Sequence, residues 1–135
     1  RRESGDWSVF YDFDQYLYVA PGEKDRGLGL FGRLGVGNED VNPTHWFASL
    51  GVGGKGVSAS RPNDAYGLAF YYLGLTDKLP PAVDARARDE WGTELYYNIA
   101  VTPWCRVTAD LQVVEPARRA VNTAVVAGLR VKCDF

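Results

Sequence analysis

Charged and amide side chains stand at alternate positions along several segments of this sequence, between apolar neighbours. Successive side chains of a β-strand point to opposite faces, so residues two positions apart, such as Asp12 and Asp14, share a face. Arg donors beside Asp, Glu and Asn acceptors suit a neutral solute that carries hydroxyl groups, whereas a ring of one sign would select ions. The candidate solute-contacting set is Asp12, Asp14, Arg33, Glu94, Asn98, Arg106, Asp110 and Arg130.

Three arginines and two aromatic residues on this face are the strongest candidates for contact with a solute. Arg33, Arg106 and Arg130 are the first candidates for a constriction, because a guanidinium is always charged. Tyr96 and Phe31 share the face and could stack on the apolar side of a solute. The alternative is that most of the charges form a structural wall and pair with one another across strands. We expect only a minority of them to touch a solute.

The same sequence offers little for catalysis or metal binding. His45 is the only histidine, so a triad or a metal cluster has little to draw on. Asp12 and Asp14 could imitate a carboxylate pair, but no general acid accompanies them. The segment Gly53-Gly-Lys-Gly56 lacks the spacing and the Ser or Thr of a phosphate-binding loop. We expect no catalytic residue, no metal and no cofactor.

Seven segments alternate at a period of two, which predicts an antiparallel all-β chain without an internal domain boundary over residues 1–135. The fourth segment is apolar on both faces, so its orientation is not determined by the pattern. The longer connections are 38–44, 76–90 and 115–122, and the shortest is the turn Thr102-Pro103. The predicted strands cover residues 7–19, 27–37, 46–52, 66–75, 91–101, 105–113 and 123–135.

The last of these segments carries an unbroken apolar face up to an aromatic residue, Phe135. Such a face must be covered by a protein core or by lipid, and about ten residues of alternation are what a transmembrane β-strand requires. The composition agrees, with 15 Gly, 13% aromatic residues and no Met. No apolar run approaches the roughly 20 residues of a transmembrane helix. With a net charge of −2 we expect no nucleic-acid partner.

The four tryptophans mark the ends of predicted strands, where the aromatic girdles of membrane barrels lie. In such barrels short turns face the periplasm and longer loops face outward. Trp7, Trp46 and Trp91 then lie at the outer interface, and Trp104 and Phe135 at the inner one. The alternative is that tryptophan at a strand start reflects β-propensity alone.

Nine segments together resemble the carboxy-terminal part of the carbohydrate-selective porins of the OprB family, in the family's order and over nearly the whole chain. They are Phe10-Tyr-Asp-Phe-Asp-Gln-Tyr-Leu17, Arg26-Gly-Leu-Gly-Leu-Phe-Gly-Arg33, Trp46-Phe47, Gly53-Gly-Lys-Gly56, Arg61-Pro62, Tyr71-Tyr-Leu-Gly-Leu75, Glu94-Leu-Tyr-Tyr-Asn-Ile-Ala-Val-Thr-Pro-Trp104, Asp110-Leu-Gln-Val113 and Pro116-Ala-Arg-Arg119. The resemblance implies a bacterial outer-membrane β-barrel that passes small, glucose-like sugars by passive diffusion. It also implies outer-membrane lipid as a partner and allows a homotrimer.

Seven strands are too few for such a channel, because an aqueous lumen needs about 16. We therefore expect either a fragment or processed chain of a longer porin, or one piece of an assembly that completes the barrel. Its last strand, ending at Phe135, is expected to serve as the signal for the barrel-assembly machinery. The alternatives are a soluble β-barrel or sandwich that binds a small ligand and, less favoured, an outer-membrane enzyme, for which no nucleophile and base are found.

Cys105 and Cys133 are a departure from the family pattern, at positions where aliphatic residues would be expected. They fall on the same face of adjacent strands near the inner end. A cross-strand disulfide is possible in an oxidising periplasm. Two apolar thiols that face lipid or a neighbour are the favoured interpretation, because disulfide geometry is strict.

Overall fold

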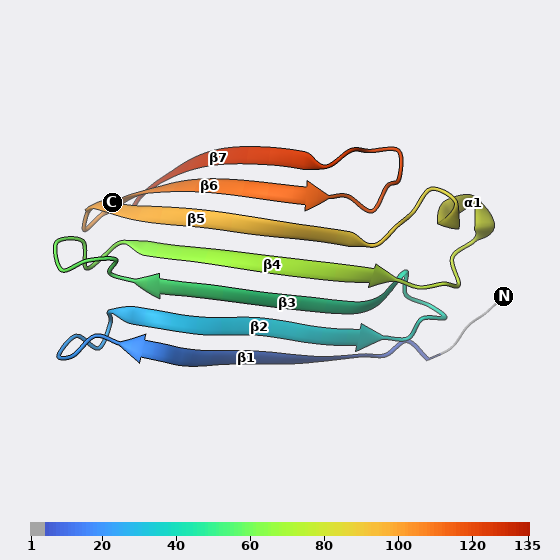
Figure 1. The fold of residues 1–135 in the computed structure, drawn as a ribbon, viewed down its shortest axis with the longest axis horizontal. Coiled ribbons are helices and arrows are strands. Elements are labelled where there is room, and N and C mark those ends of the chain that lie inside the picture. The colour runs from blue at the N-terminus through green and yellow to red at the C-terminus, as the bar shows by residue number, and fades with distance from the viewer. Residues whose placement is uncertain (1–4) are drawn as a thin grey trace.

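A computed structural model describes residues 5–135 and contains one sheet of seven antiparallel strands, which pair in chain order (Figure 1). This confirms the all-β prediction, and β2 has the expected bounds. The strands are β1 (Ser8–Val19), β2 (Gly27–Gly37), β3 (Thr44–Lys55), β4 (Ala65–Leu75), β5 (Glu90–Thr102), β6 (Cys105–Glu115) and β7 (Ala124–Cys133).

One helical turn interrupts the connection between β4 and β5, which we had expected to be a loop throughout. This helix, α1 (Pro81–Asp84), begins directly after Pro80. Proline favours the first turn of a helix, because its ring fixes φ and its missing N–H would have no partner there. None of the helices in residues 5–135 has the length and apolar character needed to cross a membrane.

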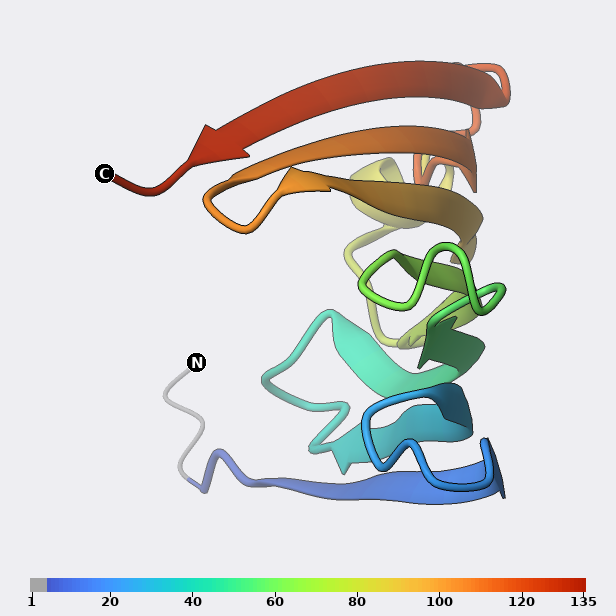
Figure 2. The ribbon, with the colours of Figure 1, turned by 90° about the vertical axis from the view of Figure 1, so that its left-hand side faces the viewer.

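The sheet forms a single curved layer rather than a packed sandwich. Figure 2 looks along the strands and shows a trough with β1 and β7 at its two rims. Ala20 is the only buried hydrophobic residue among those that the structure describes. A soluble domain of this size would bury most of its apolar surface, so the soluble binding module gains no support from the fold.

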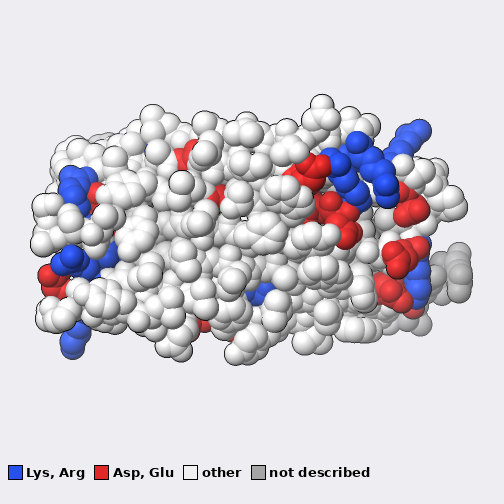
Figure 3. Space-filling model, in the orientation of Figure 1, with Lys and Arg blue, Asp and Glu red and all other residues white. Residues whose placement is uncertain are grey.

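The strand register sorts the side chains onto two faces of different chemistry. The apolar face holds large side chains that are nevertheless exposed: Val9, Tyr11, Leu34, Leu50, Val52, Leu68, Phe70, Leu95, Leu111, Val125, Leu129 and Val131. Figure 3 views the convex side of the trough, where the charged residues gather at the two ends and few lie between. The apolar face is therefore convex, and the polar face lines the hollow.

The structure determines the orientation of β4, which its composition left open. Leu68 pairs with Val52 of β3 and with Leu95 of β5, so it lies on the apolar face. Tyr71 pairs with Ser49 and Gly92, so it lies on the polar face. Cross-strand partners share a face, and the register of β3 and β5 thereby resolves β4.

One face assignment in β1 was wrong. We had expected Leu17 and Val19 to continue the apolar face, but the register shifts between Tyr16 and Tyr18. After the shift Tyr18 pairs with Leu28 on the apolar face, and Val19 pairs on the opposite face. A β-bulge adds one residue to a strand and so reverses the alternation beyond it.

Candidate functional site

All eight residues of the candidate solute-contacting set lie on the polar face, although they come from five strands. The register places Asp12 opposite Arg33, and Glu94 opposite Gln112. Thr108 of β6 pairs with Asn98 on one side and with Arg130 on the other. Asp14, Arg106 and Asp110 follow from the alternation of their strands. The structure therefore brings the set to one surface. Some of its members have polar partners on the protein, and others do not.

Arg33 and Asp12 form a two-pronged ion pair across β1 and β2. Arg33 donates from Nε to Asp12 Oδ1 at 2.5 Å and from a terminal nitrogen to Oδ2 at 3.0 Å. The guanidinium carbon also lies 5.4 Å from the centre of the Phe10 ring. Two donors of Arg33 are therefore occupied by Asp12. This is the pairing of charges across strands that a structural role of the arginine would produce.

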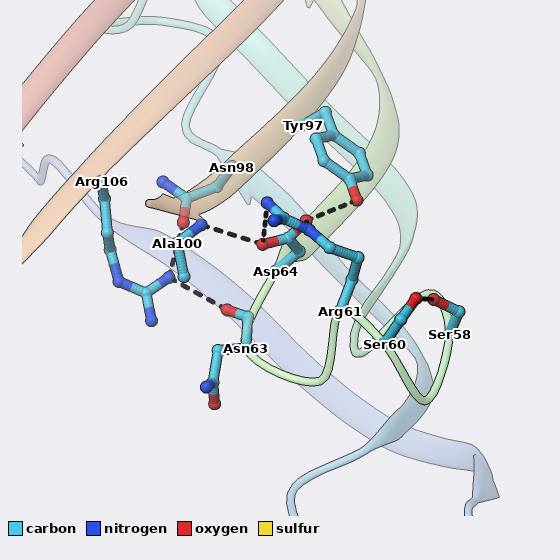
Figure 4. A network of polar contacts seen from close by, with 9 residues as sticks. All are labelled: Ser58, Ser60, Arg61, Asn63, Asp64, Tyr97, Asn98, Ala100 and Arg106. Carbon is cyan, nitrogen blue, oxygen red and sulfur yellow. Dashed lines mark hydrogen bonds and ion pairs between the residues drawn. The ribbon is translucent and has the colours of Figure 1, made fainter. Parts of the chain in front are cut away.

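Arg106 and Asn98 are tied to each other and to a turn near one end of the sheet. Arg106 donates to Asn98 Oδ1 at 2.6 Å and to the carbonyl of Asn63 at 3.3 Å. Asn98 donates in turn to Thr108 Oγ1 at 2.6 Å. Figure 4 shows Arg106 reaching from its strand toward the turn that holds Asn63. These contacts make Arg106 and Asn98 part of the wall at this end.

Three charged members of the set lack such partners. Within residues 5–135, Asp14, Glu94 and Arg130 have no hydrogen bond or ion pair to another side chain. Asp110 accepts a single hydrogen bond, from Gln112 at 3.1 Å. Glu94, Asp110 and Arg130 line a common hollow, whose other lining residues are Ala65, Tyr96, Asn98 and Thr108. This hollow offers donors and acceptors that remain available.

Two aromatic rings on the polar face cover glycines of neighbouring strands. A Cβ on Gly67 would come within 2.4 Å of the Tyr96 ring, and one on Gly51 within 2.4 Å of the Phe31 ring. Phe31 and Tyr96 line a second hollow together with Asp14 and Lys55. Tyr96 thus belongs to both hollows. Period-two alternation predicts the face on which these rings lie, but not the glycines against which they pack.

The sequence did not predict a buried carboxylate directly before the start of β4. Asp64 is only 2% exposed, although it lies in the connection between β3 and β4. It accepts hydrogen bonds from Arg61 at 2.7 and 3.0 Å, from Tyr97 Oη at 2.7 Å and from the Ala100 amide at 2.9 Å (Figure 4). Its position after Arg61-Pro62-Asn63 indicated only a turn, because the partners Tyr97 and Ala100 lie far along the chain.

These contacts determine the ionisation of Asp64. Burial alone would raise its pKa, but the hydrogen bonds from Arg61, Tyr97 and the Ala100 amide together lower the pKa below its ordinary value. The same pair raises the pKa of Arg61. Asp64 therefore holds the β3–β4 connection against β5 as a carboxylate, and this network is structural rather than solute-facing.

Aromatic side chains form a row at each end of the apolar face. At one end the Trp46 and Tyr72 rings stack with centroids 4.9 Å apart, and Tyr72 pairs with Trp91. At the other end Tyr66 pairs with Tyr97. Tyr66 and Tyr72 are six positions apart, which corresponds to about 20 Å along a strand. That spacing is close to the height of a lipid-facing band between girdles.

The remaining expected girdle residues lie outside the strands. Trp7 precedes β1 and is 54% exposed, and Trp104 lies in the turn between β5 and β6 and is 52% exposed. Phe135 follows β7 at the same end as Trp104, where the Asp134 amide donates to the Trp104 carbonyl at 2.8 Å. Their role at a membrane interface stays a prediction.

Comparison with known proteins identifies the family. The family model described as "Carbohydrate-selective porin, OprB family" matches residues 1–135. The chain is 29% identical to Porin B of Pseudomonas aeruginosa, over 84% of this chain and 29% of that protein. It superimposes on the high-pH structure of Pseudomonas putida OprB with a TM-score of 0.85 and 25% identity, over 93% of this chain and 34% of that one.

The chain thus spans about a third of the length of these relatives. Porins of this family are outer-membrane channels and not enzymes, and the same localisation applies here. Since the family model covers residues 1–135, the chain belongs to the OprB family of carbohydrate-selective porins.

Proposed function

We propose that this chain forms part of the wall of a water-filled β-barrel through which small, glucose-like sugars diffuse passively. The observation that carries the proposal is the division of one sheet into a convex apolar face and a concave polar face. Lipid covers the convex face, because exposed apolar side chains are stable there. Water and solute fill the concave side.

The two rims of the sheet support a larger barrel. β1 has 12 residues and β7 has 10, and each pairs with only one neighbour within residues 5–135. Long unpaired edges invite further strand pairing, and membrane barrels close so that no edge remains. Further strands, to a total of about 16, would complete an aqueous lumen.

The connections suggest the orientation in the membrane. The turns at one end of the sheet include the short one at Trp104, whereas the three connections at the other end include α1. Contacts tie these outer connections together, since Lys78 bonds to Asp40 at 2.7 Å and Arg88 pairs with Glu115. We assign the end with α1 to the outside, as is usual for longer loops.

The hollow beside Tyr96 is the proposed sugar contact. Arg130 supplies donors, Glu94 and Asp110 supply acceptors, and the Tyr96 ring supplies an apolar surface. A sugar has hydroxyls that donate and accept, and apolar C–H faces that stack on aromatic rings. Charges of both signs disfavour selection of one ion sign. Because a sugar must compete with water for all these groups, binding is weak and the solute can leave on either side.

The test is sugar flux through the full-length protein that contains this chain. In proteoliposomes we expect glucose to enter faster than a disaccharide, and glucose to reduce single-channel current in planar bilayers. Arg130→Ala and Tyr96→Ala should weaken the current block by glucose. Lys132→Ala is the matched control, since Lys132 lies on the same face but pairs with Asp134 at 3.2 Å. Equal glucose block in all variants, or no sugar flux, would refute the proposal.

Two partners remain predictions alongside this function. Association into a homotrimer and recognition of the strand ending at Phe135 by the assembly machinery follow from the family and from the apolar face of β7. Deletion of Phe135 should lower the amount of protein in the outer membrane. An unchanged amount would remove the recognition role.

A further inference from the structure

Cys105 and Cys133 occupy the same rung of the sheet at the open end of the β6–β7 hairpin. The register pairs them directly, and their Sγ atoms lie 3.1 Å apart. Both side chains are on the apolar face and partly exposed. Two thiols at this separation are in van der Waals contact, so a small movement brings the sulfurs to the roughly 2.05 Å of a disulfide.

The backbone at this rung suits a cross-link. The Asp134 amide donates to the Trp104 carbonyl at 2.8 Å, which makes the neighbouring rung a hydrogen-bonded pair. Hydrogen-bonded and non-hydrogen-bonded pairs alternate in an antiparallel ladder, so Cys105 and Cys133 form a non-hydrogen-bonded pair. Their Cα atoms are then expected at about 4.5 Å, within the range that disulfides span.

A metal does not explain the pair. Within residues 5–135 no group of three or more His, Cys, Asp or Glu side chains is placed to hold a metal ion. The pair lies at the strand ends beside Trp104, away from the middle of the lipid-facing band. As the chain is an outer-membrane porin, this rung is assembled in the periplasm, which is an oxidising compartment.

We propose that Cys105 and Cys133 form an intramolecular disulfide that closes the open end of the β6–β7 hairpin. The oxidant is a disulfide of the periplasm, small or protein-borne. One cysteine thiolate attacks this disulfide to give a mixed disulfide, and the second attacks the mixed disulfide. The Cys105–Cys133 bond forms, the oxidant's sulfur bond breaks, and the reduced oxidant keeps the two electrons and the two protons.

The consequence is a covalent clamp on the last strand. β6 and β7 are already joined through residues 116–123 at one end. A bond between residues 28 positions apart closes the hairpin into a ring and restricts the unfolded chain more than the folded one. The clamp hinders β7 from separating from β6 at the inner rim.

The direct test is the state of the two thiols in the full-length protein from intact cells. Cells are quenched with acid and N-ethylmaleimide, and the outer-membrane protein is digested with trypsin without reductant. We expect the peptide of residues 89–106 to be linked to the peptide that begins at Cys133, and both to become alkylated only after reduction. Alkylation of both cysteines without reduction would overturn the proposal.

Single variants exclude other linkages. In Cys133→Ser, Cys105 should be alkylated without reductant, because its partner is gone. A Cys105 that stays blocked in that variant would mean a bond to another thiol and would also overturn the proposal.

The clamp has its own readout, the thermal unfolding midpoint of the detergent-solubilised full-length protein. Reductant should lower the midpoint of the wild-type protein by a few degrees and leave the Cys105→Ser, Cys133→Ser double variant unchanged. Equal midpoints of oxidised and reduced wild-type protein would refute the stabilising role.

Discussion

Glu94 and Leu95 are consecutive residues of β5, and both side chains are exposed, yet they lie on faces with opposite chemistry. Leu95 is 53% exposed and has leucines beside it on both neighbouring strands, Leu68 and Leu111. Glu94 has Gln112 beside it and opens into the hollow with Arg130. Exposure alone therefore does not separate the two faces. In the proposed barrel, each strand of this sheet faces lipid on one side and water on the other.

The largest expected effect comes from placing a charge on the apolar face, in the middle of the lipid-facing band. Leu95→Arg should destabilise the full-length barrel in lipid vesicles by about 2–4 kcal/mol, because the bilayer solvates a charge poorly. Glu94→Arg, one residue away, should change the free energy of unfolding far less. Urea unfolding followed by tryptophan fluorescence measures both. Equal costs would mean that the two faces meet the same solvent.

The second effect concerns the β3–β4 connection, where a charged residue is buried by protein contacts instead of facing either solvent. Asp64→Ala should cost roughly 1–3 kcal/mol, because it leaves the Tyr97 hydroxyl and the Ala100 amide without their acceptor. Asp14→Ala, on the polar face, should be nearly neutral. The same urea titration compares them, and similar losses would contradict the structural role of the Asp64 network.

Asp64 also predicts a pH dependence. Its pKa is lowered in the folded protein, so its stabilising contribution is complete above the unfolded value of about 4 and is lost as pH falls below it. Asp64→Asn should flatten the acid side of the stability curve below about pH 4. A variant with the same acid slope as the wild type would show that other groups carry it.

The third effect concerns solute rather than stability. Tyr96→Ala should weaken glucose block by roughly 3–10-fold, since ring stacking contributes about 1 kcal/mol. Tyr97→Phe lies on the apolar face and should leave glucose block unchanged. Single-channel current noise in the presence of glucose gives both affinities. A larger change for Tyr97→Phe would place the solute on the wrong face.

The smallest effect separates paired from unpaired charges on the polar face. Arg33→Gln should leave glucose block unchanged, because its guanidinium is committed to Asp12. Arg130→Gln should weaken the block, since Arg130 has no side-chain partner within residues 5–135. The bilayer current measurement compares the two variants, and the reverse order would assign the constriction to Arg33.

The strands were predictable from the sequence because period-two alternation is a local signal. It gave β2 its bounds and placed Arg33, Glu94 and Arg130 on one face. It failed where the information is not local. Alternation does not reveal the bulge before Tyr18, and the orientation of β4 depends on its neighbouring strands. A one-turn helix is also too short for a periodic signal.

The site was predictable as a face but not as a set of contacts. Arg33, Arg106 and Arg130 look alike in the sequence, and only the register reveals that the first two have partners. The burial of Asp64 depends on Tyr97, which is 33 residues away. Pairing across strands decides both, because an antiparallel sheet joins residues that are distant in the chain.

The most direct test of the two-solvent account is a cysteine scan along β5 of the full-length protein, in a background of Cys105→Ser and Cys133→Ser. A membrane-impermeant maleimide should label cysteines at Glu94, Tyr96 and Asn98. Cysteines at Thr93, Leu95 and Tyr97 should resist it and react with a lipid-soluble probe instead. Labelling that alternates at a period of two is the predicted result, and uniform labelling along the strand would contradict the account.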